Sequence, residues 1–331
     1  MNPVMAHTYQ NPLPIKNIGD PFVLRTKDGS YYCYATSAAD GFKAWKSDDL
    51  VNWQDLGYVY RRQENSWGVA DFWAPEVVYH DGAYFMHYSA RWGKNESLRI
   101  GVARAESPSG PFVDVFDHPM FDFGYAAIDG HVFIDEDGEK YFYYARDCSE
   151  NIVDGRHESH LYGVRLNDDL VSFRDLPTLL TVPEQEWEIR SGLEWRWNEG
   201  PFLVKHQGLY YLMYSANCYV SREYSVGYAV AEHPLGPFHK TTQNPILSSS
   251  HEKISGPGHN SVTSSTDGRE LFIVYHIHTD PDHPSGDRQV CIDRMGFHED
   301  GSLYVVGPSN TPQALPGKIR DRSMRKQGHK F

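Results

Sequence analysis

Five segments of this sequence can be laid over one another, and this internal repeat restricts the possible folds more than any other feature. Each segment begins with a polar or aromatic residue and continues through apolar and β-branched positions to a glycine-containing pair. In chain order the segments are DPFVLRTKDGSYYCYATS from Asp20, WAPEVVYHDGAYFMHYSA from Trp73, DGHVFIDEDGEKYFYYAR from Asp129, EGPFLVKHQGLYYLMYSA from Glu199 and HNSVTSSTDGRELFIVYH from His259.

The glycine-containing pair is Asp-Gly in four of the segments and Gln-Gly in the other. Asp-Gly between alternating apolar runs is typical of a β-hairpin, because glycine accepts the positive φ that a tight turn requires. We therefore expect each segment to be a hairpin closed by a two-residue turn. The pairs are Asp28-Gly29, Asp81-Gly82, Asp137-Gly138, Gln207-Gly208 and Asp267-Gly268.

A third apolar segment follows each hairpin, and motifs such as SDDLVNW and NDDLVSF lead from it into a short fourth segment. Four strands in each of five units predict an all-β fold, a five-bladed β-propeller with four antiparallel strands per blade. A two-layer β-sandwich of hairpins is the alternative, but a sandwich does not need five equal units. We expect one domain over residues 1–331, with a short basic tail at 318–331 and blades that start near residues 20, 73, 129, 199 and 259.

Charge and targeting signals limit the possible partners and location. The formal net charge of -13 argues against nucleic acid or an anionic membrane surface as a partner, so we expect a neutral substrate. The N-terminal segment contains no apolar stretch of signal-peptide length, which predicts a cytoplasmic protein. The four cysteines are widely spaced and form no CxxC pair, so buried free thiols are expected. The sequence leaves the oligomeric state open.

The first strand of every propeller blade lines the central axis, so the five starting residues should converge at one end of the channel. Three of them are carboxylates: Asp20, Asp129 and Glu199. Each acid alone has an ordinary structural explanation, as a turn cap, a turn residue or a solvated strand end. Three acids together raise one another's pKa and cost stability, so their convergence indicates a functional site.

Hydrolysis of a glycosidic bond with inversion suits such a group of acids. It requires one protonated carboxyl group at the leaving oxygen and one ionised carboxylate that activates water from the opposite side. A third carboxylate can raise the pKa of the acid and keep it protonated. Trp73 could supply a flat apolar wall for a sugar, and Arg288 could donate two hydrogen bonds to hydroxyl groups or to a carboxylate. Packing at a blade junction and a surface charge are the respective alternatives.

Five short motifs, one per unit and in order, resemble glycoside hydrolase family 43. The resemblance covers about residues 15–308, and it implies a five-bladed propeller that cleaves α-L-arabinofuranosyl or β-D-xylosyl linkages with inversion. The motifs are IGDPFV around Asp20, FWAPEV around Trp73, AIDGHVF around Asp129, WNEGPF around Glu199 and GPGHNSV around His259.

The resemblance also implies roles for individual residues. Asp20 is similar to the family's general base, Asp129 to the residue that tunes and orients the acid, and Glu199 to the general acid. Ile128, in the AIDGHVF motif, and Arg288 are similar to residues that contact the sugar. His259 is similar to a histidine near Ca²⁺ or another small cation on the axis, although calcium prefers oxygen ligands. A transition-metal site in HIHTDPDH (residues 276–283) is a further possibility, and a strand that leads into a Pro-rich loop explains this stretch equally well.

For the substrate, we expect a neutral pentose-containing oligosaccharide and an exo-acting α-L-arabinofuranosidase. The chain ends soon after the fifth repeat, whereas many β-xylosidases of the family carry a further C-terminal β-sandwich. Long inserts at residues 147–160 and 183–197 are expected to be rim loops that could close a pocket. The alternatives are a β-D-xylosidase or dual-activity enzyme, an endo-arabinanase, a non-catalytic sugar-binding propeller, and a phosphorylase that acts on mannosides.

Overall fold

The computed structural model describes residues 8–190, 192–250 and 253–317, and within them the all-β prediction is confirmed. In these ranges the only helix is a 3₁₀ turn, η1 (Glu186–Ile189), and no helix there is long and apolar enough to cross a membrane. The predicted basic tail at 318–331 lies outside the described residues.

Each of the five repeats forms a meander of four antiparallel strands. The first unit contains β2 (Lys16–Arg25), β3 (Tyr31–Ala38), β4 (Gly41–Ser47) and β5 (Gln54–Arg61). The second contains β6 (Gly68–His80), β7 (Ala83–Trp92), β8 (Leu98–Ala105) and β9 (Val113–Asp114). The third contains β10 (Ala127–Ile134), β11 (Lys140–Arg146), β14 (His160–Arg165) and β15 (Thr178–Thr181). The fourth contains β17 (Asn198–His206), β18 (Leu209–Ala216), β19 (Ser225–Ala231) and β20 (His239–Lys240). The fifth contains β21 (Gly258–Ser264), β22 (Leu271–His278), β23 (Arg288–Phe297) and β24 (Leu303–Val305).

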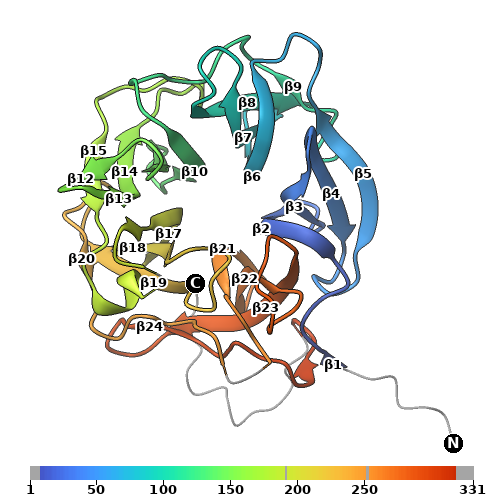
Figure 1. Ribbon diagram of the computed structural model, residues 1–331. Helices are drawn as coiled ribbons and strands as arrows, with labels where there is room; N and C mark the ends of the chain where they lie inside the picture. Colours follow the sequence, from blue (N-terminus) through green and yellow to red (C-terminus); the bar gives the residue numbers. More distant parts are fainter. Residues whose placement is uncertain (1–7, 191, 251–252, 318–331) are drawn as a thin grey trace, which may run out of the picture.

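The units stand around a common centre, with the first strand of each unit innermost (Figure 1). The fifth and first units are joined into one eight-stranded sheet, because the start of β2 pairs with β23. The two ends of the described chain also meet: β1 (Thr8–Tyr9) pairs with β25 (Gln313–Ala314). This pairing adds to the contact between the N-terminal segment and the fifth unit, where the Tyr9 hydroxyl donates to the carbonyl oxygen of Ile292 at 3.1 Å.

The hairpin turns are of two kinds, and the prediction of a two-residue turn in every unit is wrong for three of them. The second and fourth units have two-residue turns at 81–82 and 207–208. In the first, third and fifth units the strands are separated by longer loops at 26–30, 135–139 and 265–270. In the first of these loops the N–H of Gly29 donates to the carbonyl oxygen of Thr26 at 2.9 Å and closes a turn, and Gly29 itself has a φ of +88°. The Asp-Gly pair is therefore part of a longer connection there.

Aromatic side chains fill the space between neighbouring sheets. Between the first and second units, Phe42 packs against Phe72 and Tyr88, with ring centroids 6.0 and 5.5 Å away. Tyrosine suits these positions between the sheets, because its ring can be buried while its hydroxyl reaches a polar partner at the sheet edge. The Tyr88 hydroxyl, for example, donates to Oδ1 of Asp114 at 2.5 Å.

The two long inserts pair with each other. The first insert forms β12 (Ile152–Val153) and β13 (Arg156–Glu158), and the second forms β16 (Trp195–Arg196), which runs parallel to β13. The rings of His157 and Trp195 stack with centroids 3.8 Å apart. The second insert also contains η1 and leads directly into β17, the innermost strand of the fourth unit.

Candidate active site

All five innermost strands are interrupted at a corresponding position, and the residue at the interruption has a left-handed backbone. Strand pairing shifts there in each unit, as a β-bulge does. The residues with positive φ are Asp20 (54°), Ala74 (45°), Asp129 (62°), Gly200 (56°) and His259 (49°).

This register corrects the alignment drawn from the sequence. Asp20, Asp129 and His259 do occupy equivalent positions, but Trp73 and Glu199 lie one residue earlier, at the position of Ile128. The reason is the length of the hairpin turns: the two-residue turns of the second and fourth units place the bulge one residue nearer the turn glycine. Counting back from that glycine therefore matches residues that are not equivalent.

A side chain from the preceding unit accepts the N–H of the left-handed residue in four of the five units. Each of these side chains lies at the same position of its own unit, on the second strand, where it pairs with the residue just before the bulge. The contacts are Thr36 Oγ1 with Ala74 N (2.9 Å), Ser89 Oγ with Asp129 N (2.9 Å), Ser215 Oγ with His259 N (2.7 Å) and His276 Nδ1 with Asp20 N (3.0 Å). The last contact links the fifth unit back to the first.

The fourth unit is the exception. The residue at the corresponding position of the third unit is Ala145, which has no side-chain acceptor. The N–H of Gly200 donates instead to Oδ2 of Asp129, at 2.9 Å. An acid of the site thus takes the place that a hydroxyl or imidazole fills elsewhere in the ring.

Asp20 is held as a carboxylate. Oδ1 lies 2.8 Å from Nη1 of Arg288 and 3.3 Å from Nδ1 of His259, and Oδ2 accepts a hydrogen bond from Thr36 Oγ1 at 2.6 Å. Burial alone would raise the pKa of Asp20, but Arg288, then His259 and His276, outweigh burial and lower this pKa below its ordinary value.

The pKa values of Asp129 and Glu199 are raised, in contrast to that of Asp20. Burial raises the pKa of Asp129 to about 6, against the opposing effects of His259 and of the Gly200 N–H. Burial, followed by the charge of Asp129, raises the pKa of Glu199 well above its ordinary value. The Tyr224 hydroxyl donates to Oε1 of Glu199 at 2.8 Å, which leaves Oε2 to carry the acid proton. The surroundings therefore favour the ionised form of Asp20 and the protonated form of Glu199.

Arg288 and Trp73 border a cleft of about 340 Å³ next to Asp20. The Arg288 side chain packs directly on Gly19, where an added Cβ would lie 2.0 Å from Cζ of Arg288. Trp73 is partly buried against the core between the third and fourth units. Ile128 belongs to the same core and is 6% exposed, so its contact with a sugar remains a prediction.

Sequence reasoning missed several residues of this site. The fully buried ring of Tyr224 is parallel to that of His276, with centroids 5.6 Å apart. The Tyr224 hydroxyl bonds to Glu199, and His276 accepts the N–H of Asp20. His276 stood out in the sequence only as a possible metal ligand, and nothing in the sequence marked Tyr224. The carboxylate of Asp147 contributes to the raised pKa of both Asp129 and Glu199.

The donors around His259 do not form a calcium site by themselves. Within the described part of the chain no group of three or more His, Cys, Asp or Glu side chains is placed to hold a metal ion, whereas Ca²⁺ takes six to eight oxygen ligands. The ring of His259 packs on Gly200 and faces Asp20. In the second candidate stretch, residues 276–283, His278 is engaged by Ser255 Oγ and by the carbonyl oxygen of Tyr219, at 2.9 and 2.7 Å. A cation held through water at His259 stays a prediction.

Known proteins are similar to this chain in sequence and in fold. A crystal structure of a thermostable family-43 glycoside hydrolase matches with a TM-score of 0.90 and 51% identity, and the match covers 93% of this chain and 99% of that one. The β-D-galactofuranosidase xynD of Aspergillus niger is 30% identical over 92% of this chain and 84% of its own length. A xylosidase/arabinosidase of Bacteroides ovatus is 28% identical over 73% of each chain. The family model of glycosyl hydrolases family 43 matches residues 9–303, and the chain therefore belongs to this family of glycoside hydrolases.

Proposed function

We propose that this chain is an inverting, exo-acting α-L-arabinofuranosidase, and that its five units are the blades of a five-bladed β-propeller. The observation that carries the mechanism is the contrast between the surroundings of two carboxyl groups, that of Asp20 next to Arg288 and that of Glu199, which is buried and bonded to the Tyr224 hydroxyl. Asp20 is kept ionised beside Arg288, and Glu199 is kept protonated by burial and by Asp129. Inversion needs one group of each kind.

In the proposed reaction, Asp20 accepts a proton from a water molecule as the oxygen of that water bonds to the anomeric carbon. Glu199 donates its proton from Oε2 to the glycosidic oxygen as the bond from that oxygen to the anomeric carbon breaks. The transition state resembles an oxocarbenium ion, so the attacking water becomes acidic as it bonds and a weakly basic carboxylate is sufficient. Asp129 maintains the raised pKa of Glu199 and does not itself exchange a proton with the substrate.

Support for a furanoside substrate comes from the relatives. The Aspergillus niger relative is named for β-D-galactofuranose, and the Bacteroides ovatus relative for xylose and arabinose. α-L-Arabinofuranose and β-D-galactofuranose share their ring configuration and differ in the exocyclic group at C4. A site that fits one of them around Trp73 and Arg288 therefore needs little change to fit the other. β-D-Galactofuranosidase activity is the second candidate, and β-D-xylosidase activity is the third.

Initial hydrolysis rates on three p-nitrophenyl glycosides test the substrate: α-L-arabinofuranoside, β-D-galactofuranoside and β-D-xylopyranoside, with the Asp20→Ala variant as the blank. We expect the arabinofuranoside to be the fastest. A dominant rate on either other glycoside would replace the substrate and keep the mechanism. NMR of the first-formed sugar should show the inverted anomer, and a retained anomer would contradict the assignment of Asp20 as a base. Internal cleavage of arabino-oligosaccharides would contradict the exo assignment.

A further inference from the structure

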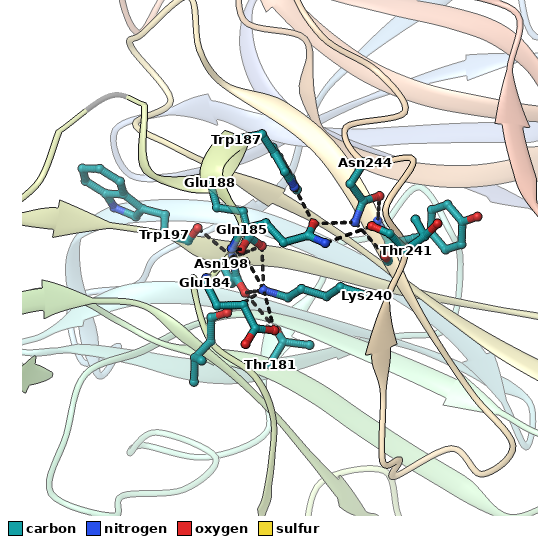
Figure 2. Close-up of polar contacts among 12 residues, drawn as sticks. Thr181, Glu184, Gln185, Trp187, Glu188, Trp197, Asn198, Lys240, Thr241 and Asn244 are labelled. Atoms are coloured by element: carbon teal, nitrogen blue, oxygen red, sulfur yellow. Dashed lines mark hydrogen bonds and ion pairs between the residues drawn. The ribbon is translucent and has the colours of Figure 1, made fainter.

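A buried ion pair connects the fourth unit to η1, the helical turn in the insert before β17. Nζ of Lys240, on the outermost strand β20, lies 2.7 Å from Oε1 and 2.9 Å from Oε2 of Glu188 in η1. The two side chains are 4% and 0% exposed. Figure 2 shows both groups within a dense set of polar contacts. Burying two charges is costly, so such a pair is weak evidence for stability and invites a search for another role.

The ion pair is joined directly to the residue before the acid. Asn198 is fully buried, and its Nδ2 donates to Oε1 of Glu188 at 3.0 Å, while its Oδ1 accepts a hydrogen bond from Nζ of Lys240 at 3.2 Å (Figure 2). Thr181, at the end of β15, donates to the same Oδ1 at 3.0 Å. The next residue along β17 is Glu199. The amide of Asn198 is thus fixed from both of its ends.

A second chain of hydrogen bonds runs from η1 towards Tyr224, whose hydroxyl donates to Glu199. The carbonyl oxygen of Trp187, next to Glu188, accepts a hydrogen bond from Nδ2 of Asn217 at 2.7 Å. Nδ2 of Asn217 also donates to the carbonyl oxygen of Glu223 at 2.9 Å, and the following residue is Tyr224.

The helical turn is itself tied to the outer edge of the fourth unit. Oε2 of Glu188 accepts the N–H groups of Glu184 and Gln185 at 2.8 and 2.6 Å. The Gln185 side chain donates to the carbonyl oxygen of Thr241 at 2.9 Å, and accepts from Asn244 Nδ2 at 3.1 Å. These bonds anchor the segment that precedes Asn198 to the loop after Lys240.

We propose that Lys240 and Glu188 are positioning residues for the proton donor Glu199, and that they act through Asn198. The inference rests on the proposed function, in which Glu199 protonates the leaving group. Because Asn198 and Glu199 are adjacent in one strand, a shift of the Asn198 amide moves the backbone of the acid. Proton donation is sensitive to such a shift, since the acid must lie within hydrogen-bond reach of the glycosidic oxygen.

The test uses substrates that differ in their need for a proton. The Lys240→Met variant is compared with wild type on a dinitrophenyl glycoside, whose leaving group needs little protonation, and on an unactivated disaccharide of the same sugar. We expect the disaccharide rate to fall at least about tenfold further than the dinitrophenyl rate, a part of the ~10²–10⁴-fold that general acid catalysis supplies. We also expect the alkaline limb of the pH profile to move.

Lys205→Met is the matched control. Lys205 lies on the same strand β17, near the hairpin turn, and its Nζ pairs with Oδ1 of Asp135 at 2.5 Å. This variant should leave the ratio of the two rates unchanged. If Lys240→Met leaves Glu188 unpaired and does not fold, the double variant Lys240→Met with Glu188→Gln removes the unpaired charge and should keep the loss on the disaccharide.

The outcomes separate the two proposals. Equal losses on both substrates in a folded variant would overturn the positioning role and leave the proposed function standing. A double variant with the leaving-group dependence of wild type would do the same. A wild-type protein that hydrolyses none of the glycosides would overturn the proposed function, and the positioning role with it.

Discussion

The backbone N–H of Gly200 donates a hydrogen bond to Oδ2 of Asp129, and this bond joins the third and fourth units at the candidate active site. It exists because Ala145 has no side-chain acceptor at a position where the other units carry threonine, serine or histidine. Asp129 thereby reaches the residue next to Glu199, which explains how one acid can tune the other. The arrangement predicts what a hydroxyl group at residue 145 would do.

Ala145→Ser should weaken the link between Asp129 and Gly200. A serine hydroxyl opposite the bulge can accept the N–H of Gly200, and Asp129 would then lose a donor that lowers its pKa. The pKa of Asp129 should rise, so Asp129 would carry less charge near neutral pH and the pKa of Glu199 should fall. We expect the alkaline limb of the activity profile to move to lower pH. An unchanged profile in a folded variant would show that the Gly200 bond has no part in tuning the acid.

Asp129→Asn should move the same limb further. The charge of Asp129 is second only to burial among the causes that raise the pKa of Glu199. Without that charge Glu199 releases its proton at a lower pH, and activity is lost as the pH rises through this lower value. The profile of kcat/KM, which reports the free enzyme, should therefore narrow from its alkaline side. If the alkaline limb stays at the same pH, it reports the titration of a group other than Glu199.

Asp20→Ala and Glu199→Ala should differ in their response to the leaving group. Loss of the base should lower the rate on every substrate, by about 10²–10⁴-fold if Asp20 acts as proposed. Loss of the acid should cost a similar factor on an unactivated disaccharide and much less on a dinitrophenyl glycoside, which needs no proton. Steady-state kinetics on both substrates distinguish the roles, and an equal loss on both for Glu199→Ala would contradict its assignment as the acid.

Gly19→Ala should disturb Asp20 through Arg288. The added methyl group would overlap the guanidinium, so Arg288 must move away from its position 2.8 Å from Asp20. The pKa of Asp20 should then rise, because Arg288 is the strongest of the groups that lower it. Activity that is lost as the pH falls should be lost at a higher pH than in wild type. Gly286→Ala is the control, since its methyl group meets no atom within 4 Å in the same cleft.

The sequence determined the repeating architecture and the identity of the acids. Five hairpins with glycine turns, each followed by two further strands, can be read from local patterns, because strand alternation and turn chemistry are local properties. The same repeat predicted that Asp20, Asp129 and Glu199 converge, and in the structure their charges act on one another, since inner strands converge whatever their exact register.

Only the tertiary structure decided the register and the protonation. The bulge lies one residue nearer the turn glycine in the fourth unit than in the third, and this places Glu199 at the position of Ile128, one residue ahead of its expected equivalents. Groups from other units help to set each pKa: Asp20 meets His276 of the fifth unit, 256 residues away, and Glu199 is affected by the charge of Asp129 in the third unit. Burial and charge at a site depend on neighbours brought together when the five units pack around a common centre, so no local pattern could reveal them.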